Sequence, residues 1–167
     1  MSNFLDVDWS TLPAPQDDGA VAHMRGARLT SLVLPATDGR AVDLSALSGR
    51  TVLYVYPLTG RPDRPLPAGW DAIPGARGCT PQSCAFRDHW SEMQALGVKQ
   101  LFGLSTQDTE YQKEAADRNH LPFPLLSDAE LRFATAHRLP TFEVEGMVLL
   151  KLMSFVVDDG VVSLVLY

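Results

Sequence analysis

The sequence predicts an α/β fold with a mixed central sheet, helices on both faces of that sheet, and a closing antiparallel hairpin. Residues 51–56 are mostly β-branched and aromatic with almost no polar alternation, which is typical of a central strand covered on both faces. From residue 81 onward helical and strand-like segments alternate, which favours parallel strands joined by helices. Asp159-Gly160 then separates two β-branched runs, and this dipeptide predicts a tight hairpin turn.

The composition fits one globular domain. The chain has 167 residues, 46% of them hydrophobic, and about 100 to 200 residues per domain is typical. Its formal net charge of −6 comes without a stripe of lysines and arginines, so we expect no nucleic-acid partner. The longest apolar stretch, residues 147–157, is interrupted by Lys151 and is too short to span a bilayer. Residues 1–8 lack the pattern of a signal peptide, so we expect a soluble, cytoplasmic protein with no membrane partner.

The first half of the chain contains two segments without clear secondary structure. Residues 1–27 are acidic and broken by proline and glycine, so we expect an arm packed loosely over a domain of residues 28–167. A turn is expected at residues 37–40, between residues 32–34 and residues 42–44, before the central strand that ends at Pro57. Residues 58–78 then contain four prolines and four glycines, and a loop of this length inside a compact domain is commonly functional or disordered.

The second half follows a regular alternation. Phe86, Trp90 and Met93 have the i, i+4, i+7 spacing of a buried helical stripe. We expect helices at residues 81–96, 107–119 and 128–137, with Ser105 or Thr106 as the cap of the second and Asp128 as the cap of the third. We expect strands at residues 100–104, 123–126, 148–157 and 161–167.

The whole cysteine complement is one close pair, Cys79 and Cys84. In a continuous helix, five residues place two Cα atoms roughly 8 to 9 Å apart on divergent faces. A disulfide rarely spans more than about 7 Å between Cα atoms. A bond between the two therefore requires the first helical turn to unwind, unless Cys79 lies in the loop before the helix. The pair fits a transient redox bond better than a structural one.

The two thiols differ in their surroundings. Cys79 falls at the helix start, where unpaired N–H groups and the positive end of the helix dipole favour a thiolate. Arg77 adds a nearby cation, whereas Cys84 lies a turn further along and gains less from either effect. We therefore expect Cys79 to attack and Cys84 to resolve.

These residues resemble a known family. Tyr54-Val55-Tyr56-Pro57 at the end of a central strand, Gly78-Cys79-Thr80 at a helix start, and Cys84-Ala85-Phe86-Arg87-Asp88 resemble Q-type (bacterioferritin-comigratory-protein-like) peroxiredoxins. Residues 102–105, 123–128 and 154–160 are similar to later strands and turns of that family, so the match covers residues 27–167. The resemblance implies a thioredoxin-like fold and a thiol peroxidase that reduces hydrogen peroxide or small organic hydroperoxides.

The resemblance also implies roles for single residues. Cys79 would attack the peroxide and become a sulfenic acid, which would condense with Cys84 and be reduced by a thioredoxin-like partner. Pro57 would shield the thiolate, and Thr80 and Arg87 would contact substrate. No metal or cofactor is implied. We expect a monomer or weak dimer.

Two family positions are filled differently here. The family has a threonine three residues before the reactive cysteine, where this chain has Ala76. It has an arginine three residues before the phenylalanine of the last hairpin's first strand, where this chain has Leu152. Thr59 and Arg77 are the hydroxyl and the cation that we expect to serve instead as hydrogen-bond donors.

Other interpretations remain open at this stage. A thiol–disulfide oxidoreductase would usually carry a Cys-x-x-Cys motif, which is absent. A redox sensor would use the same two cysteines to reshape the helix for a partner. Zinc binding by Cys79, Cys84 and His89 is disfavoured, because a five-residue spacing scatters the side chains around a helix. We expect structural roles for His120 and His137, and a packing role for Trp70.

Overall fold

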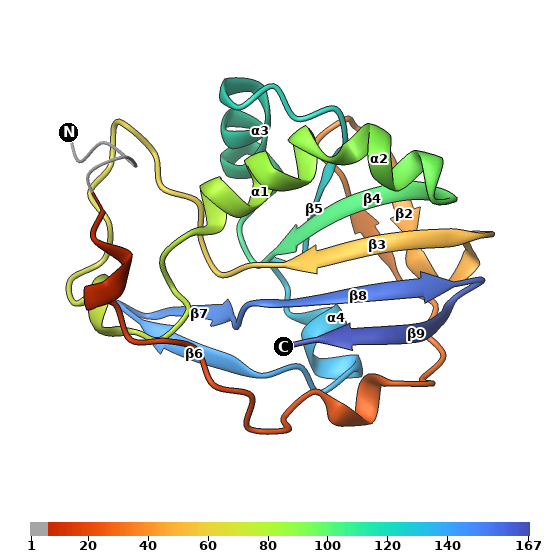
Figure 1. Cartoon of the computed structure of the whole chain (residues 1–167), viewed down its shortest axis with the longest axis horizontal. Coiled ribbons are helices and arrows are strands. Elements are labelled where there is room, and N and C mark those ends of the chain that lie inside the picture. Colours follow the sequence, from red (N-terminus) through yellow and green to blue (C-terminus); the bar gives the residue numbers. More distant parts are fainter. Residues whose placement is uncertain (1–6) are drawn as a thin grey trace.

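The computed structural model describes residues 7–167, and its core is a mixed sheet (Figure 1). In this part of the chain the central sheet has five strands in the order β5-β4-β3-β8-β9. The central strand β3 is parallel to β4 and antiparallel to β8. The predicted fold class is therefore confirmed. The strands are β3 (Arg50–Val55), β4 (Val98–Ser105), β5 (Leu125–Ser127), β8 (Met153–Asp158) and β9 (Val161–Leu166).

Helices cover both faces of this sheet. Successive side chains of a strand point to opposite faces, so Tyr54 joins one core cluster and Leu53 the other. The helices α1 (Cys79–Asp88), α2 (Trp90–Ala95) and α3 (Thr109–Arg118) belong to the face with Tyr54. The short helix α4 (Arg132–Ala136) covers the opposite face and lies behind β9 in Figure 1.

The N-terminal segment packs more tightly than expected. Residues 1–6 lie outside the described part, and the 3-10 turns η2 (Trp9–Thr11) and η3 (Ala22–Met24) follow. Val21 and Met24 are buried in the core on the face of α4. The N–H of Gly26 donates to the carbonyl oxygen of Val162 at 2.8 Å, which ties this segment to β9. The second half of the expected arm is thus part of the core.

Three hairpins surround or complete the sheet. The strands β1 (Val33–Pro35) and β2 (Ala41–Asp43) pair on either side of the expected turn, and η4 (Leu44–Ala46) follows. The closing hairpin β8–β9 is confirmed, with positive φ at Asp159 (49°) and Gly160 (78°), as its tight turn requires. A further hairpin, β6 (Thr141–Val144) with β7 (Met147–Leu150), was not predicted.

The predicted single strand at residues 148–157 is wrong. Lys151 and Leu152 separate β7 from β8, and only β8 joins the central sheet. The reason is a turn at Glu145 and Gly146, both with positive φ (48° and 76°), which pairs β7 with β6. The apolar run looked continuous because both strands pack against core residues.

The helix predicted at residues 81–96 is divided into two helices, and the first of them begins two residues earlier than predicted. α1 starts at Cys79, and the chain breaks at His89 before α2. Pro81 is accommodated because the first turn of a helix does not use its N–H groups internally. Phe86, Trp90 and the rest of the predicted apolar stripe do pack against the core.

The two later helices begin at residues other than those predicted. The cap of α3 is Asp108, not Ser105 or Thr106, because its carboxylate accepts the N–H of Tyr111 at 2.7 Å. Asp128 accepts the N–H groups of Phe133 and Ala134 at 2.9 and 2.8 Å, so it does bind the start of α4. The helix itself begins only at Arg132, after Leu131 in a left-handed conformation (φ 57°).

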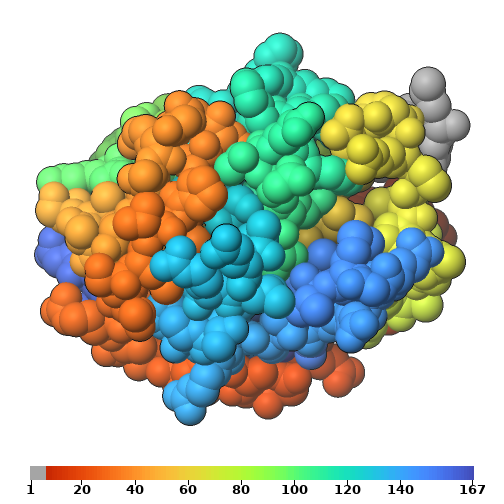
Figure 2. Space-filling model, turned by 180° about the vertical axis from the view of Figure 1, so that it is seen from behind, coloured from red at the N-terminus to blue at the C-terminus, as the bar shows by residue number. Residues whose placement is uncertain are grey.

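The inserted segment, residues 58–78, is folded onto the β6–β7 hairpin. Its 3-10 turn η5 (Trp70–Ala72) buries Trp70, whose ring centroid is 6.1 Å from that of Phe142. The N–H of Ala68 donates to the carboxylate of Glu145 at 3.0 Å. Figure 2 shows the yellow segment beside the blue hairpin. The expected packing role of Trp70 is confirmed.

No helix among residues 7–167 combines the length and apolarity that a bilayer crossing needs.

A close approach between β3, β4 and β5 gives the first testable prediction. A Cβ on Gly103 would lie 2.6 Å from a methyl of Leu125 and 2.7 Å from the ring of Tyr54. Gly103→Ala should therefore lower the free energy of unfolding by about 1 to 3 kcal/mol, as overpacking typically does. Gly60→Ala is the control, because its Cβ would meet only Leu66 at 3.7 Å. Urea denaturation measures both, and equal midpoints would contradict the prediction.

Candidate active site

Cys79 is the first residue of α1 and lies at the inner end of a cleft. Its side chain is 2% exposed and packs with Tyr54 and Tyr56 of the central strand region. Its thiol donates a weak hydrogen bond to the carbonyl oxygen of Ala76 at 3.5 Å. The cleft has a volume of about 1230 Å³ and is walled mainly by the inserted segment. The buried sulfur of Cys79 and a site for a second molecule therefore meet at the start of α1.

Burial sets the protonation state of Cys79. Loss of water raises the pKa of the thiol to about 12, although the backbone N–H groups of Leu58 and of Cys79 itself favour the thiolate. The expectation that the helix start lowers this pKa is wrong for the present conformation. The physical reason is that desolvation of a fully buried thiolate outweighs the helix dipole. In this conformation Cys79 is a protonated thiol at neutral pH.

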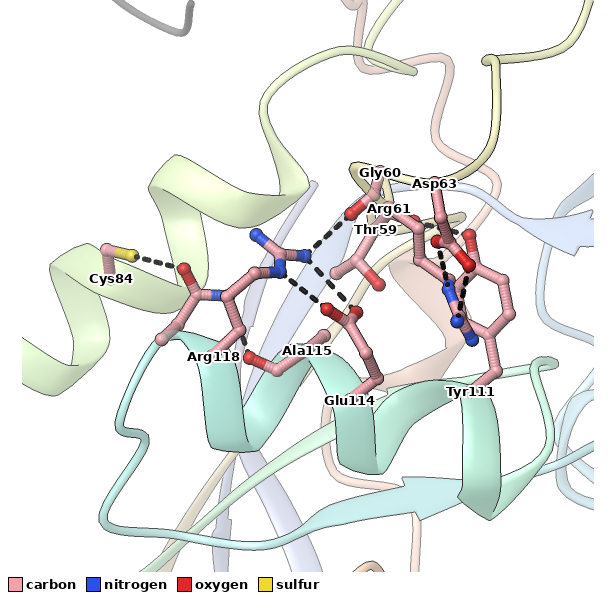
Figure 3. Close-up of polar contacts among 10 residues, drawn as sticks. Thr59, Gly60, Arg61, Asp63, Cys84, Tyr111, Glu114, Ala115 and Arg118 are labelled. Atoms are coloured by element: carbon pink, nitrogen blue, oxygen red, sulfur yellow. Dashed lines mark hydrogen bonds and ion pairs between the residues drawn. The ribbon is translucent and has the colours of Figure 1, made fainter.

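Cys84 points away from the cleft, toward the end of α3. It is half-buried, and its sulfur lies 3.7 Å from the side-chain oxygen of Asn119. Figure 3 shows Cys84 facing α3. Arg87 donates to the carbonyl oxygen of the same Asn119 at 2.7 Å and pairs with Asp88 at 2.8 Å. The structure thus places Arg87 beside Cys84 and not among the residues that line the cleft.

Both cysteines are free, and they occupy one unbroken helix. The spacing of five residues therefore keeps their Cα atoms roughly 8 to 9 Å apart. The first turn is held by a bond from the N–H of Gln82 to the carbonyl oxygen of Gly78 at 2.9 Å. The hydroxyl of Tyr54 also donates to that of Ser83 at 3.0 Å. A Cys79–Cys84 bond would require these contacts to break.

Pro57 and Thr59 lead from the central strand into the inserted segment. The carbonyl oxygen of buried Pro57 accepts the hydroxyl of Ser105 at 3.1 Å. The backbone of Thr59 is fixed at both ends, by Gln107 at 3.2 Å and by the hydroxyl of Tyr111 at 2.8 Å. Its own hydroxyl is buried and meets no hydrogen-bond partner among residues 7–167. Thr59 therefore has an unused donor next to the cleft residue Leu58.

Arg77 and Thr80 both line the cleft. Arg77 forms an ion pair with Asp71 at 2.7 Å, which draws its charge toward the inserted segment. The hydroxyl of Thr80 is buried and, within the described residues, has no partner. Both side chains can thus reach a molecule bound in the cleft.

Sequence reasoning missed the part that α3 takes in this site. Arg118 donates to the carbonyl oxygen of Gly60 at 2.8 Å and pairs with Glu114 at 2.7 Å (Figure 3). Arg118, Arg61 and Arg64 also line the cleft. The i, i+4 spacing of Glu114 and Arg118 is visible in the sequence, but nothing in it shows contact with a segment some 58 residues earlier.

Two further positions bear on the site of Cys79, Leu152 in place of the family arginine and His89 as a candidate zinc ligand. Leu152, at the position of the family arginine, packs against the apolar cluster that contains Cys79. His89 lies at the break between α1 and α2, where its ring faces Glu92 at 3.2 Å. Across residues 7–167 no three His, Cys, Asp or Glu side chains are grouped to hold a metal ion.

Comparison with known proteins identifies relatives over most of the chain. A family model described as Redoxin matches residues 24–165. A chloroplastic peroxiredoxin Q from Oryza sativa subsp. japonica is 36% identical over 105 residues, which are 62% of this chain and 41% of that protein. A putative peroxiredoxin bcp from Coxiella burnetii is 33% identical over 106 residues, 63% of this chain and 60% of that protein. The chain thus spans about two to three fifths of these relatives.

Solved structures agree with the fold. Peroxidoxin BcpB from Mycobacterium tuberculosis superimposes with a TM-score of 0.68 at 27% identity, over 86% of this chain and 84% of that one. A cysteine-to-serine mutant of PrxQ from Xylella fastidiosa gives a TM-score of 0.67 at 15% identity, over 85% and 84%, and supports the fold alone. These names confirm the resemblance to Q-type peroxiredoxins.

The buried thiol gives the second testable prediction. In a Cys84→Ser variant, the rate of Cys79 alkylation by iodoacetamide should rise about tenfold per pH unit from pH 7 to 10, because only the thiolate reacts. An ordinary thiol would level off near its pKa of about 8.5. The pKa of about 12 moves that plateau beyond the measured range. A plateau in the alkylation rate anywhere between pH 7 and 10 would contradict the prediction.

Proposed function

This chain belongs to the Redoxin family, and we propose that it is a thiol peroxidase that reduces hydrogen peroxide or organic hydroperoxides. The observation that carries the proposal is the position of Cys79, at a helix start and at the inner end of a large cleft. An inert structural thiol has no need of a cleft. Backbone N–H groups aimed at the sulfur are also the donors that stabilise a forming negative charge.

The proposed reaction has three balanced steps. The Cys79 thiolate attacks the terminal peroxide oxygen, so that a sulfur–oxygen bond forms, the O–O bond breaks, and an alkoxide leaves and takes a proton. The Cys84 thiol then attacks the Cys79 sulfenic acid, which forms the disulfide and releases water. A thioredoxin-like dithiol reduces the disulfide and is itself oxidised.

Before the first step Cys79 must lose its proton. Burial opposes this in the present conformation, and a cation near the sulfur would favour it. Arg77 is the suitable cation because it lines the cleft and sits two residues from Cys79. Its ion pair with Asp71 has to loosen for its charge to turn toward the sulfur. In this scheme the hydroxyls of Thr59 and Thr80 donate hydrogen bonds to the peroxide. Arg87 interacts with Cys84, outside the cleft.

The partner, the assembly and the cellular location are proposed alongside the reaction. We propose a thioredoxin-like reductant, a monomer or weak dimer, and a cytoplasmic protein. Two other functions use the same cysteines: a thiol–disulfide oxidoreductase acting on proteins, and a redox sensor. Peroxide kinetics separate them from a peroxidase.

The proposal is tested by stopped-flow oxidation of the reduced protein with hydrogen peroxide. We expect oxidation of Cys79 at least a hundredfold faster than that of a free thiol, and repeated turnover with thioredoxin and its reductase. Cys84→Ser should leave Cys79 as a sulfenic acid that a cyclic diketone traps. An oxidation rate equal to that of a free thiol would exclude the peroxidase function. Rapid oxidation without turnover would favour the sensor.

A hydroxyl test addresses Thr59. Thr59→Val keeps the shape of the side chain and removes only the unpartnered hydroxyl, so the oxidation rate should fall about tenfold or more while stability is unchanged or slightly raised. Thr51→Val is the matched control, since its hydroxyl is also buried and lacks a partner among residues 7–167, but it lies in β3 and is not next to a residue that lines the cleft. Stopped-flow rates and urea midpoints are measured together. Equal rates for the two variants would exclude Thr59 as a donor.

A further inference from the structure

The cleft at Cys79 is much larger than the group that Cys79 is proposed to attack. Its volume is about 1230 Å³. A water molecule occupies about 30 Å³ in the liquid, and hydrogen peroxide has only one more oxygen atom. Pockets of about 300 to 1,000 Å³ hold drug-sized ligands. The surplus comes from the inserted segment, which contributes most of the lining. The cleft therefore has room for the body of a larger molecule.

The walls of this cleft combine apolar and cationic side chains. Leu58, Leu66, Trp70 and Ala76 belong to one apolar cluster and also line the cleft. Four arginines line it against two aspartates, in a protein whose formal net charge is −6. These arginines are Arg61, Arg64, Arg77 and Arg118. A local excess of positive charge in an acidic protein attracts anions to this opening.

Three of the four arginines already have anionic partners. Arg77 pairs with Asp71 at 2.7 Å, Arg118 with Glu114 at 2.7 Å, and Arg61 with Asp63 at 2.9 Å. Arg64 differs, because it forms no ion pair with any residue that the structure describes.

Arg64 also lies near the aromatic ring that Arg61 contacts. Its guanidinium carbon lies 5.9 Å from the centroid of the Tyr111 ring, and that of Arg61 lies 5.3 Å from the same centroid. Asp63 already neutralises Arg61 at 2.9 Å, so within the described residues Arg64 is the guanidinium near this ring whose charge an anion can still neutralise. Arg64 is exposed at the rim of the cleft, whereas Cys79 is buried within it.

We propose that this cleft binds organic hydroperoxides that carry a carboxylate or phosphate at one end of an apolar body. The anion binds at Arg64 beside Arg61, the apolar body lies along Leu66 and Trp70, and the hydroperoxide reaches Cys79. The buried hydroxyl of Thr80, which has no partner within residues 7–167, is available to the peroxide oxygens. The inference rests on the proposed function. The terminal oxygen passes to the Cys79 sulfur as before, and the product is the alcohol with its anionic end unchanged.

A matched pair of substrates tests the role of charge. A fatty-acid hydroperoxide and its methyl ester, both kept below their micelle concentrations, differ only in the negative charge. We expect the acid to oxidise Cys79 about fivefold faster than the ester, which corresponds to about 1 kcal/mol, with the ratio falling as salt is added. A long-chain phosphate ester carrying the same hydroperoxide should behave like the acid.

Variants then locate the charge. Arg64→Gln should bring the acid-to-ester ratio close to one, while Arg25→Gln should leave it at the wild-type value. Arg25 is the control because it is an exposed arginine outside the cleft. Equal rates for acid and ester in the wild type, or an unchanged ratio in Arg64→Gln, would overturn the inference.

A binding assay separates this inference from the peroxidase itself. The saturated fatty acid of the same length, which carries no peroxide, should slow alkylation of Cys79 more than its methyl ester does. This difference should disappear in Arg64→Gln. Slow oxidation by every peroxide combined with this protection would reject the peroxidase and keep the anion site. Normal peroxide kinetics without protection would reject the anion site alone.

Discussion

The first turn of α1 is the constraint on which the site depends. It holds Cys79 in the core beneath the inserted segment, and it holds Cys84 on the opposite side against Asn119. The helix is fixed from the sheet side as well, because Phe86 of α1 stacks on Tyr54 with ring centroids 4.5 Å apart. One helix thus keeps the two thiols apart, and any bond between them has to be made at the expense of that packing.

The electrostatics of Cys79 follow from the same burial. A helix N-terminus contributes about 0.3 to 1 kcal/mol to a nearby negative charge, and up to about 2 kcal/mol in favourable partly buried geometries. Each unit of pKa corresponds to about 1.4 kcal/mol, so the rise to about 12 reflects a larger opposing effect. Leu152 adds to that effect, since it places apolar surface against the cluster of Cys79 where a cation would have favoured the thiolate. The present conformation therefore protects the sulfur, and reactivity requires a change in what surrounds it.

The sequence predicted those features that depend on local pattern. The apolar run of β3, the Phe86 and Trp90 stripe and the Asp159-Gly160 turn each have a periodicity or a dipeptide that belongs to one structure. The β6–β7 hairpin and the late start of α4 were missed because positive φ at Glu145 and Leu131 has no strong residue signature. At the site, both cysteines were found, but the protonation of Cys79 and the cleft arginines depend on burial and on contacts between distant segments. Those quantities exist only once the chain is folded.

The role of α3 shows how such distant contacts join two parts of the site. At the end of α3, Asn119 contacts the thiol of Cys84. The preceding residue, Arg118, donates to the carbonyl oxygen of Gly60 in the inserted segment. Tyr111, near the start of the same helix, holds the backbone of Thr59. The wall of the cleft and the resting position of the second thiol are therefore fixed by one rigid element. The proposed disulfide would require Cys84 to leave Asn119, and this contact lies one residue away from Arg118, which binds the wall of the cleft. The proposed substrate binding and the proposed disulfide formation would therefore act on the same helix end.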